Sequence, residues 1–234
     1  IRNKYSKGNL YVLNGLENNN INIFKKNRII PILISKEELD IYIKGNYFKK
    51  DIEIGINIDT GINRLGILTT NLDIKLTKKI NIHLLISHFA SADELNNSYC
   101  NLQNRIFKSF FSYFKSIKYK SLANSAGIIR SEDYHYDIIR PGISLYGGYE
   151  NKKLKKMLPM NTVIKLKAKI LQIKYINKNE FVGYNQTYKT KKKTKVAILG
   201  IGYGDGIHRI LSNNGYVFFK KQKFKIIGRI SMDS

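Results

Sequence analysis

Over about the first 150 residues, short and almost continuously apolar runs alternate with longer segments in which apolar residues recur at helical spacing. Such runs are typical of parallel strands buried on both faces, and their alternation with helices is typical of a parallel α/β sheet. The runs predict strands at residues 10–13, 30–34, 52–58, 82–86, 120–123 and 143–146. The segments between them predict helices at residues 16–26, 36–45, 71–79, 92–116 and 125–130. The pattern leaves open whether the sheet closes into a barrel.

Local signals refine two of these helices. Ser35 precedes the second one and Glu38 follows three residues later, a spacing that predicts a capping box. The fourth helix carries an apolar residue at every fourth position: Leu102, Ile106, Phe110 and Phe114. A stripe with this spacing predicts the face of the helix that packs against the sheet.

Near residue 150 the pattern changes. A polar, basic stretch at residues 151–156 is followed by Pro159, and beyond it the helical period is lost. Strands are predicted at residues 163–173, 194–198, 216–219 and 224–230, with a turn at Asn213-Asn-Gly215. We therefore expect two domains, an α/β domain at residues 1–150 and an all-β domain at residues 160–234, with the boundary within residues 148–162.

Composition excludes several classes of protein. No apolar run reaches the ~18 residues that a membrane span needs, and the first residues lack the apolar core of a secretory signal. The single cysteine, Cys100, cannot form an internal disulfide, and no histidine has metal-ligand spacing with it or with carboxylates. We expect a cytoplasmic protein without a membrane partner and without a metal.

The net charge is +24, from 41 Lys and Arg against 17 Asp and Glu. A basic chain can bind nucleic acid by neutralising phosphates. The lysines are scattered, however, and Asn and Ile are abundant with them, which is the signature of an AT-rich coding sequence. We therefore expect no nucleic-acid partner. A basic nucleic-acid-binding protein stays as an alternative, which clustering of the lysines on one face would favour.

Small polar turns follow several apolar segments. Ala123-Asn-Ser125-Ala-Gly127 and Arg140-Pro-Gly142 suit the end of a β/α barrel at which the last strand-to-helix loops often hold a phosphate, so the pair indicates a cofactor enzyme. Polar motifs also follow two earlier predicted strands, at residues 59–66 and 87–93. Taken singly, each motif is also explained by a capped loop or a structural histidine.

Taken together, seven motifs occur in one order, at residues 59–66, 87–93, 123–126, 140–147, 183–188, 202–206 and 228–233. In this order the chain resembles alanine racemase from about Tyr11 to Met232. The resemblance implies a partial (β/α)8 TIM barrel that carries pyridoxal 5′-phosphate, followed by part of an all-β C-terminal domain. It implies interconversion of L-alanine and D-alanine for peptidoglycan, by a homodimer whose active site is shared between the subunits.

The resemblance also implies which residues bind the cofactor: Asn124, Ser125, Gly142, Ile143, Arg140 and His88. Ser125 and the backbone N–H groups of Gly142 and Ile143 would hold the phosphate. Arg140 matches the arginine that faces the pyridine nitrogen. Because a guanidinium does not readily release a proton, that nitrogen would stay unprotonated, which limits side reactions such as transamination.

Racemisation removes a proton from one face of Cα and returns one to the other face, so it needs two bases. The resemblance makes Tyr184 one of them, acting across the dimer interface. A tyrosine phenol normally keeps its proton until about pH 10, so it needs a cationic or hydrogen-bonding neighbour. The family provides it as a chain from Tyr184 to His88 and from His88 to Arg140, and these three are the predicted catalytic residues.

Four further residues are implied to meet the substrate. Arg64 would contact the substrate carboxylate and the phenolic oxygen of the cofactor. Tyr203 and the backbone N–H of Met232 would shape a small pocket from the partner subunit, and Asp233 would lie near its mouth.

The chain departs from the family's pattern in three places. The motif that carries the second base, a lysine that also binds the cofactor, is absent, so no lysine is assigned to that role. The position two before Asp59, often a carbamylated lysine in the family, is Asn57, and Ser234 stands where a glutamine is common. We expect an internal piece of a longer enzyme, inactive in isolation.

Other functions stay open at this point. A racemase of the same fold acting on serine, on lysine or on several amino acids is the nearest alternative. A decarboxylase of the same fold type would have an acid where Arg140 stands, and a non-catalytic cofactor-binding regulator would lack the β-domain.

Overall fold

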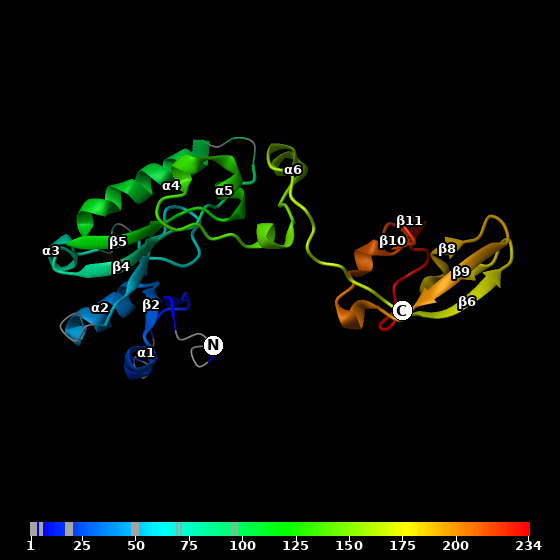
Figure 1. Cartoon of the computed structure of the whole chain (residues 1–234), viewed down its shortest axis with the longest axis horizontal. Coiled ribbons are helices and arrows are strands. Elements are labelled where there is room, and N and C mark those ends of the chain that lie inside the picture. Colours follow the sequence, from blue (N-terminus) through cyan, green and yellow to red (C-terminus); the bar gives the residue numbers. More distant parts are fainter. Residues whose placement is uncertain are drawn as a thin grey trace. The chain divides into compact units, whose positions relative to one another are not determined.

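The computed structural model describes residues 4, 7–16, 21–47, 52–68, 70, 72–94, 96 and 98–234. The chain divides into two compact units, Ile1–Ile164 and Lys165–Ser234 (Figure 1). The division lies just beyond the stretch in which the composition of the sequence changes.

The first unit contains a five-stranded parallel sheet in which the strands stand in sequence order. They are β1 (Leu10–Val12), β2 (Ile29–Leu33), β3 (Gly55–Asn57), β4 (Asn81–Ile86) and β5 (Ser116–Ser121). A doubly wound sheet reverses its strand order partway, whereas a β/α barrel adds each strand beside the last. The predicted parallel α/β sheet is therefore confirmed, and its order is that of a barrel segment.

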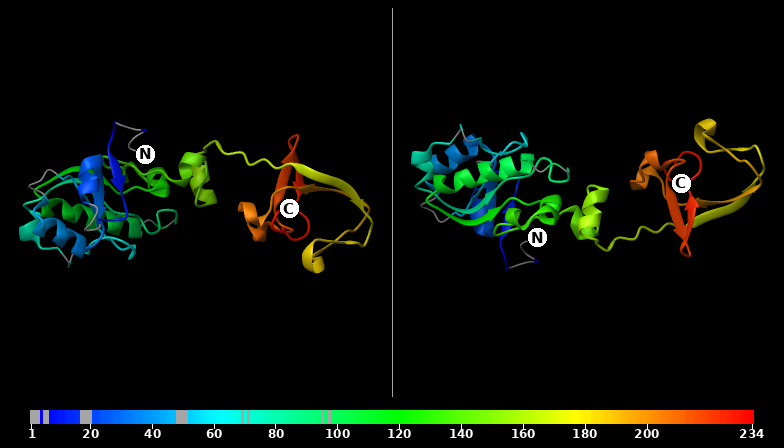
Figure 2. Two further views of the ribbon diagram at one scale, coloured as in Figure 1. Left: turned by 90° about the horizontal axis from the view of Figure 1, so that it is seen from below. Right: turned by 90° about the horizontal axis from the view of Figure 1, so that it is seen from above.

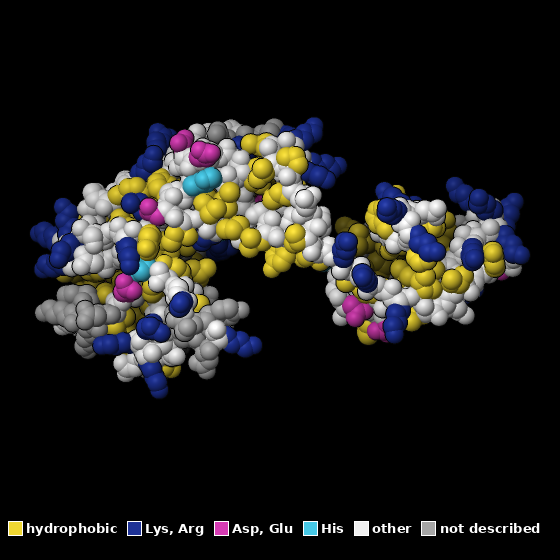
Figure 3. Space-filling view, in the orientation of Figure 1, with side chains coloured by type: hydrophobic (Ala, Val, Ile, Leu, Met, Phe, Trp, Pro, Cys, Tyr) yellow, Lys and Arg dark blue, Asp and Glu magenta, His cyan; other side chains and the backbone are white. Residues whose placement is uncertain are grey.

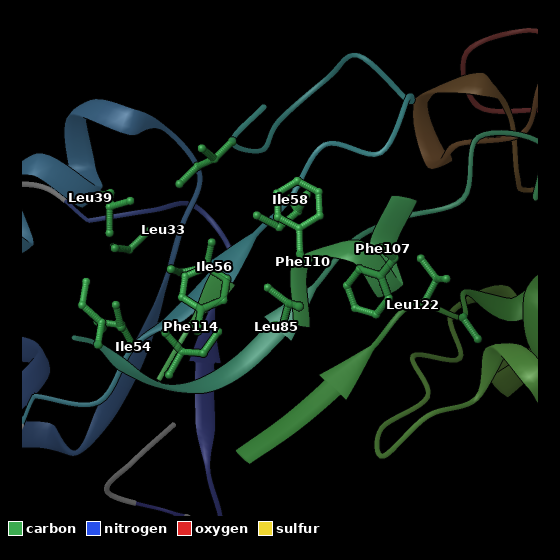
Figure 4. Packing of buried hydrophobic residues seen from close by; sticks show 14 of the residues in the cluster. Leu33, Leu39, Ile54, Ile56, Ile58, Leu85, Phe107, Phe110, Phe114 and Leu122 are labelled. Atoms are coloured by element: carbon green, nitrogen blue, oxygen red, sulfur yellow. The ribbon is translucent and has the colours of Figure 1, made fainter. Parts of the chain in front are cut away.

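The helices of this unit are α1 (Ile21–Asn27), α2 (Lys36–Lys44), α3 (Ile74–Thr77), α4 (Ser98–Ser109), α5 (Ser125–Arg130) and α6 (Lys152–Met157). Side chains of the helices pack with alternate strand residues in one large buried cluster. Figure 4 shows the rings of Phe107 and Phe110 lying over strand residues such as Leu85. The opposite face of the sheet holds a smaller cluster around Ile32, Leu84 and Ile86. Both faces are buried, which explains why the strands read as continuous apolar runs.

The cap predicted for α2 is confirmed in part. Ser35 Oγ accepts the N–H of Glu38 at 3.3 Å, as an N-cap does. The carboxylate of Glu38 accepts the N–H of Ile34 at 2.8 Å, one residue earlier than a capping box requires. The side chain thus ties the end of β2 to the start of the helix.

Two predicted elements of this unit are wrong. Residues 143–146 form a 3-10 helix, Ile143–Tyr146, closed by Gly147 at φ +74°, and Ile143 is 46% exposed instead of buried in a strand. The predicted helix 92–116 is shorter: α4 ends at Ser109, a 3-10 helix covers Phe110–Tyr113, and Ser116 already begins β5. Residues 17–20, 71, 95 and 97, at or near the starts of predicted helices, lie outside the described residues.

The apolar stripe predicted on α4 is also only partly correct. Phe110 and Phe114 are buried, and Ile106 packs against the core, but Leu102 is 40% exposed. The buried side chains of the helix itself are Cys100, Gln103, Asn104 and Phe107. Two of these, Gln103 and Asn104, carry polar amides. The spacing of apolar residues alone therefore predicted a buried face that is slightly rotated about the helix axis from the observed one.

The second unit is built from three antiparallel pairs, as an all-β module requires (Figure 2). β6 (Ile170–Ile176) pairs with β9 (Thr194–Leu199), β7 (Phe181–Val182) pairs with β8 (Tyr188–Lys189), and β10 (Tyr216–Phe219) pairs with β11 (Gln222–Lys225). The β10–β11 turn has Lys220 and Lys221 at φ +47° and +69°, the left-handed geometry of a two-residue hairpin turn.

Several bounds in this region differ from the predictions. The strand predicted from residue 163 begins only at Ile170, and the last one ends at Lys225 rather than at residue 230. Helix α6 lies in the stretch predicted as the domain boundary. The turn at Asn213-Asn-Gly215 is confirmed: Asn213 has φ +59° and its carboxamide oxygen accepts the N–H of Gly228 at 2.7 Å.

On the face shown in Figure 3, Lys and Arg side chains stand at many separate points of both units. In the part of the chain that the structure describes, no helix is long and apolar enough to cross a membrane. The same residues contain no group of three or more His, Cys, Asp or Glu side chains that could hold a metal ion.

Candidate active site

Polar side chains follow three neighbouring strands of the parallel sheet, where each strand ends. Asp59 lies just after β3, His88 just after β4, and Asn124 just after β5. The carboxyl ends of parallel strands lie at one edge of the sheet, and in barrels this edge carries the active site. The fold therefore gathers three of the predicted motifs.

Arg140 lies at this edge, where its guanidinium contacts residues at the ends of β4 and β5. Its Nη1 donates to Ser121 Oγ at 2.5 Å, and its Nη2 donates to the carbonyl oxygen of Ser87 at 2.5 Å and to that of Leu122 at 3.4 Å. Within the described residues, no carboxylate pairs with this guanidinium. Burial lowers the pKa of Arg140 to about 10. Removing a cation from water costs free energy that neutral acceptors only partly offset. Such an arrangement is typical of functional sites.

His88 lies between Arg140 and the next loop. Its Nδ1 is 3.4 Å from Arg140 Nη2, and its Nε2 is 3.5 Å from Asn124 Nδ2. Burial, followed by the positive charges of Arg140 and Arg64, lowers the pKa of His88 to about 4. The imidazole is therefore neutral near pH 7. A guanidinium and an amide nitrogen both only donate, so the neutral ring accepts from one of them; with Nδ1 accepting from Arg140, the ring proton is on Nε2 and the Asn124 contact is not a hydrogen bond.

The loop after Arg140 meets the start of α5 at Ser125. Ser125 is buried, and its Oγ accepts the N–H of Gly142 at 2.8 Å and that of Ser144 at 3.4 Å. The hydroxyl of Ser144 lies 3.2 Å from the same oxygen. Asn124 caps α5, with its carboxamide oxygen accepting the N–H of Gly127 at 2.9 Å. Several hydrogen-bond donors thus converge at one point beside Arg140.

Arg64 stands on a loop that Asp59 organises. The Oδ1 of Asp59 accepts the N–H of Gly61 at 2.8 Å and that of Asn63 at 3.1 Å. Asn57 Nδ2 donates to the carbonyl oxygen of Leu65 at 3.1 Å, on the far side of the loop. Arg64 itself is exposed, and its charge acts on His88.

Three buried polar residues lie under this site, and the sequence assigned a role to none of them: Thr60 and Ser87, which belong to the motifs at residues 59–66 and 87–93, and Gln103, which belongs to none. Thr60 Oγ1 lies 2.8 Å from Ser87 Oγ, and Gln103 Nε2 donates to Thr60 Oγ1 at 3.2 Å. No motif pointed to Gln103, because one glutamine within an amphipathic helix reads as part of the solvent face. Its burial becomes apparent only from the packing of α4.

The second unit holds the remaining predicted residues. Tyr184 is in a 3-10 helix, Tyr184–Gln186, that follows Gly183 at φ +75°, and it is 70% exposed. Tyr203 donates its N–H to the carbonyl oxygen of Ser231 at 2.9 Å, and Gly204 donates to that of Met232 at the same distance. The motifs of Tyr203 and Met232 therefore lie side by side, with Asp233 exposed next to them.

Two arginines without a predicted role lie in the same unit: Arg229, which belongs to the motif at residues 228–233, and Arg209, which belongs to none. Arg209 and Arg229 line a depression of about 500 Å³ together with Thr187, Ile210, Ser212, Asn213 and Asn214. The guanidinium of Arg209 also lies 5.7 Å from the ring centroid of Tyr203. The motif at residues 228–233 pointed to Arg229, whereas no motif contains Arg209.

Comparison with known families decides the relationship of the chain. Residues 1–150 match the family described as "Alanine racemase, N-terminal domain", and residues 163–234 match "Alanine racemase, C-terminal domain". The chain belongs to the alanine racemase family. The two matched regions fall on the two kinds of structure that the chain contains, the α/β sheet and the β module.

Curated relatives agree with this membership. The alanine racemase of Rickettsia canadensis (strain McKiel) is 38% identical over 234 residues, which are 96% of this chain and 62% of the relative. That of Rickettsia typhi (strain ATCC VR-144 / Wilmington) is 30% identical, with 96% of this chain and 67% of the relative covered. The chain thus spans about three fifths of the length of the first relatives it matches.

Solved structures of alanine racemases have the same fold. The Bartonella henselae enzyme, described with covalently bound pyridoxal phosphate, superposes with a TM-score of 0.84 at 33% identity over 96% of this chain and 64% of that one. The Bacillus anthracis enzyme, described with bound L-Ala-P, gives 0.79 at 28% identity over 99% and 63%. The barrel segment and the β module are therefore those of the alanine racemase fold.

Proposed function

We propose that the protein to which this chain belongs is an alanine racemase that uses pyridoxal 5′-phosphate to interconvert L-alanine and D-alanine, supplying D-alanine for peptidoglycan. The observation that carries the proposal is the Arg140 guanidinium, enclosed among neutral acceptors beside His88 and without a carboxylate partner in the described residues. Family membership over both regions of the chain supports it.

The residues present fit the phosphate of this cofactor. The Ser125 hydroxyl and the N–H groups of Gly142 and Ser144 converge within hydrogen-bond distance, and Ile143 lies between the last two. A phosphate offers several acceptor oxygens, and hydrogen bonds to a charged acceptor are about twice as strong as neutral ones. Ser125 with the N–H groups of Gly142 and Ile143 would hold it, and Asn124 would keep Ser125 in place by capping α5.

Arg140 would face the ring nitrogen of the cofactor. When bound, the ring supplies the electron sink that makes the Cα proton of the substrate acidic. Arg140 can donate a hydrogen bond to the nitrogen but keeps its own proton, because even at a pKa of about 10 it stays protonated near neutral pH. The arginine thereby holds back protonation of the ring, which favours return of the proton to Cα over side reactions.

Proton transfer needs one base on each face of Cα. Tyr184 serves as one of them, from the partner subunit of a homodimer. Its high exposure within its own unit leaves the hydroxyl available for a site formed on association. The Nε2–H of His88 would donate to the Tyr184 oxygen and stabilise its deprotonated form. Arg140 would in turn fix the tautomer of His88 from the other side.

The substrate site is proposed to be small. Arg64 would bind the carboxylate of the amino acid, and its exposed position leaves the guanidinium free to reach a ligand. Tyr203 and the N–H of Met232 would narrow the space around the substrate side chain, with Asp233 near the mouth. A methyl group fits such a space best, so alanine is the proposed substrate.

Activity of the purified full-length gene product with pyridoxal phosphate tests the proposal. L-alanine, L-serine and L-lysine are offered separately, and chiral chromatography measures the opposite enantiomer. We expect the highest kcat/KM for alanine, loss of activity in Arg140→Leu, and unchanged activity in the surface control Leu102→Ala. Faster turnover of serine or lysine would contradict the assigned substrate. Release of CO2 without an enantiomer would contradict the racemase itself.

A further inference from the structure

Gln103 is a polar side chain in the most buried part of α4. It is 0% exposed, and its neighbours on the buried face of the helix are Cys100, Asn104 and Phe107. An unpaired amide in such a place costs ~1–3 kcal/mol, so its hydrogen bonds decide whether it is tolerated. Among the described residues, its hydrogen-bond partners lie on the loops that follow β3 and β4.

The carboxamide of Gln103 forms hydrogen bonds with the backbone at and after His88. Its Oε1 accepts the N–H of Ala90 at 3.0 Å, and its Nε2 donates to the carbonyl oxygen of His88 at 3.1 Å. The two backbone groups thus belong to Ala90 and to His88 itself. A single side chain therefore fixes the loop at and just beyond His88.

The same carboxamide reaches the residue before His88 through Thr60. Gln103 Nε2 donates to Thr60 Oγ1 at 3.2 Å, and Thr60 Oγ1 lies 2.8 Å from Ser87 Oγ. The carbonyl oxygen of Ser87 accepts a hydrogen bond from Arg140 at 2.5 Å. The buried chain from Gln103 through Thr60 and Ser87 thus ends on the guanidinium that faces His88.

We propose that Gln103 is a positioning residue, which sets the imidazole of His88 at its distance from Arg140 through the backbone of residues 87–90. Its importance for turnover rests on the proposed racemase function, but its effect on His88 does not. A merely structural amide would stabilise the fold without influencing the surroundings of the histidine ring.

The pKa of His88 in the full-length gene product, measured by NMR titration of its imidazole, reports this positioning directly. The signal that disappears in His88→Gln assigns the imidazole of His88. In the native protein we expect a pKa near 4, because the ring is half-buried beside Arg140 and feels the charge of Arg64. In Gln103→Leu the loop is released and water reaches the ring, so the pKa rises toward the reference value of ~6.5.

Asn104→Leu is the matched control. Asn104 is the next residue on α4, also buried, and its Oδ1 accepts the hydroxyl of Tyr136, away from His88. This variant removes a buried amide from the same helix and should leave the pKa of His88 unchanged. An equal rise in both variants, or no rise in a folded Gln103→Leu, overturns the proposal.

Thr60→Val provides a second variant of almost equal volume should Gln103→Leu fail to fold. It removes Thr60 Oγ1, which links Gln103 to Ser87, but leaves the bonds of Gln103 to His88 and Ala90. The His88 pKa should therefore rise in the same direction by a smaller amount, and an unchanged pKa overturns the proposal. If the protein racemises alanine, Gln103→Leu should lower kcat by up to about 100-fold with KM nearly constant, since small misplacements of a catalytic group have effects of that size. Failure of racemisation in the native protein would leave the pKa comparison valid.

Discussion

The half-buried, neutral imidazole of His88 should make the stability of the protein depend on pH between about 6.5 and 4. Burial and two nearby guanidinium groups lower its pKa to about 4, against a reference of ~6.5 in the unfolded chain. As the pH falls below ~6.5, His88 is protonated in the unfolded chain but stays neutral in the folded protein. The free energy of unfolding therefore decreases until the pH is below 4, where His88 is protonated in both states. At ~1.4 kcal/mol per pH unit the full loss is ~3 kcal/mol.

Because the imidazole is only partly buried, solvent screening reduces this figure, and we expect a loss of ~1–2 kcal/mol between pH 8 and pH 5. Urea denaturation followed by circular dichroism measures it in the native protein and in His88→Gln. The variant should lose ~1–2 kcal/mol less over this range than the native protein does. His135→Gln is the control, since His135 is half-buried on another loop, with its Nε2 2.9 Å from the carbonyl oxygen of Ile128. An equal loss in His88→Gln and the native protein would refute the reasoning.

Three further predictions concern single side chains. Ser125→Ala should weaken binding of pyridoxal phosphate about tenfold, since a hydrogen bond to a charged group contributes ~1.5–3 kcal/mol; a spectroscopic titration with unchanged affinity would count against the phosphate site. Tyr184→Phe should slow proton removal from one enantiomer far more than from the other, measured as deuterium uptake at Cα, and unchanged uptake from both would remove Tyr184 from its role. Phe110→Ala should lower the free energy of unfolding by ~3–5 kcal/mol, while Leu102→Ala should change it by no more than ~0.5 kcal/mol, and similar losses in both would contradict the packing of α4 and of the 3-10 helix that follows it.

The central strands were predictable because both of their faces are buried. In β4 the five positions from Ile82 to Ile86 are all buried, so no exposed residue interrupts the run, whereas before and within β3 the buried Ile54 and Ile56 alternate with the exposed Glu53 and the partly exposed Asn57. The run at residues 143–146 has the same apolar character, yet it follows Pro141 and Gly142 and forms a 3-10 helix in which Ile143 is exposed. Apolar composition alone does not distinguish the two cases.

The candidate site was predictable where a motif has a fixed spacing, as at His88 and Arg140, which the structure brings to 3.4 Å. Gln103 could not be found in this way, because its burial depends on the angle at which α4 meets the sheet. Leu102 illustrates the same limit in reverse, as an apolar residue at the expected spacing that faces solvent.

The course of the reaction from each pure enantiomer tests the racemase assignment most directly. Full-length protein with pyridoxal phosphate is given L-alanine in one vessel and D-alanine in another, and both are followed by chiral chromatography. Since enantiomers have equal free energies, the account predicts that both vessels converge on an equal mixture. No conversion from either enantiomer, or conversion that ends in CO2 instead of the opposite enantiomer, would contradict it.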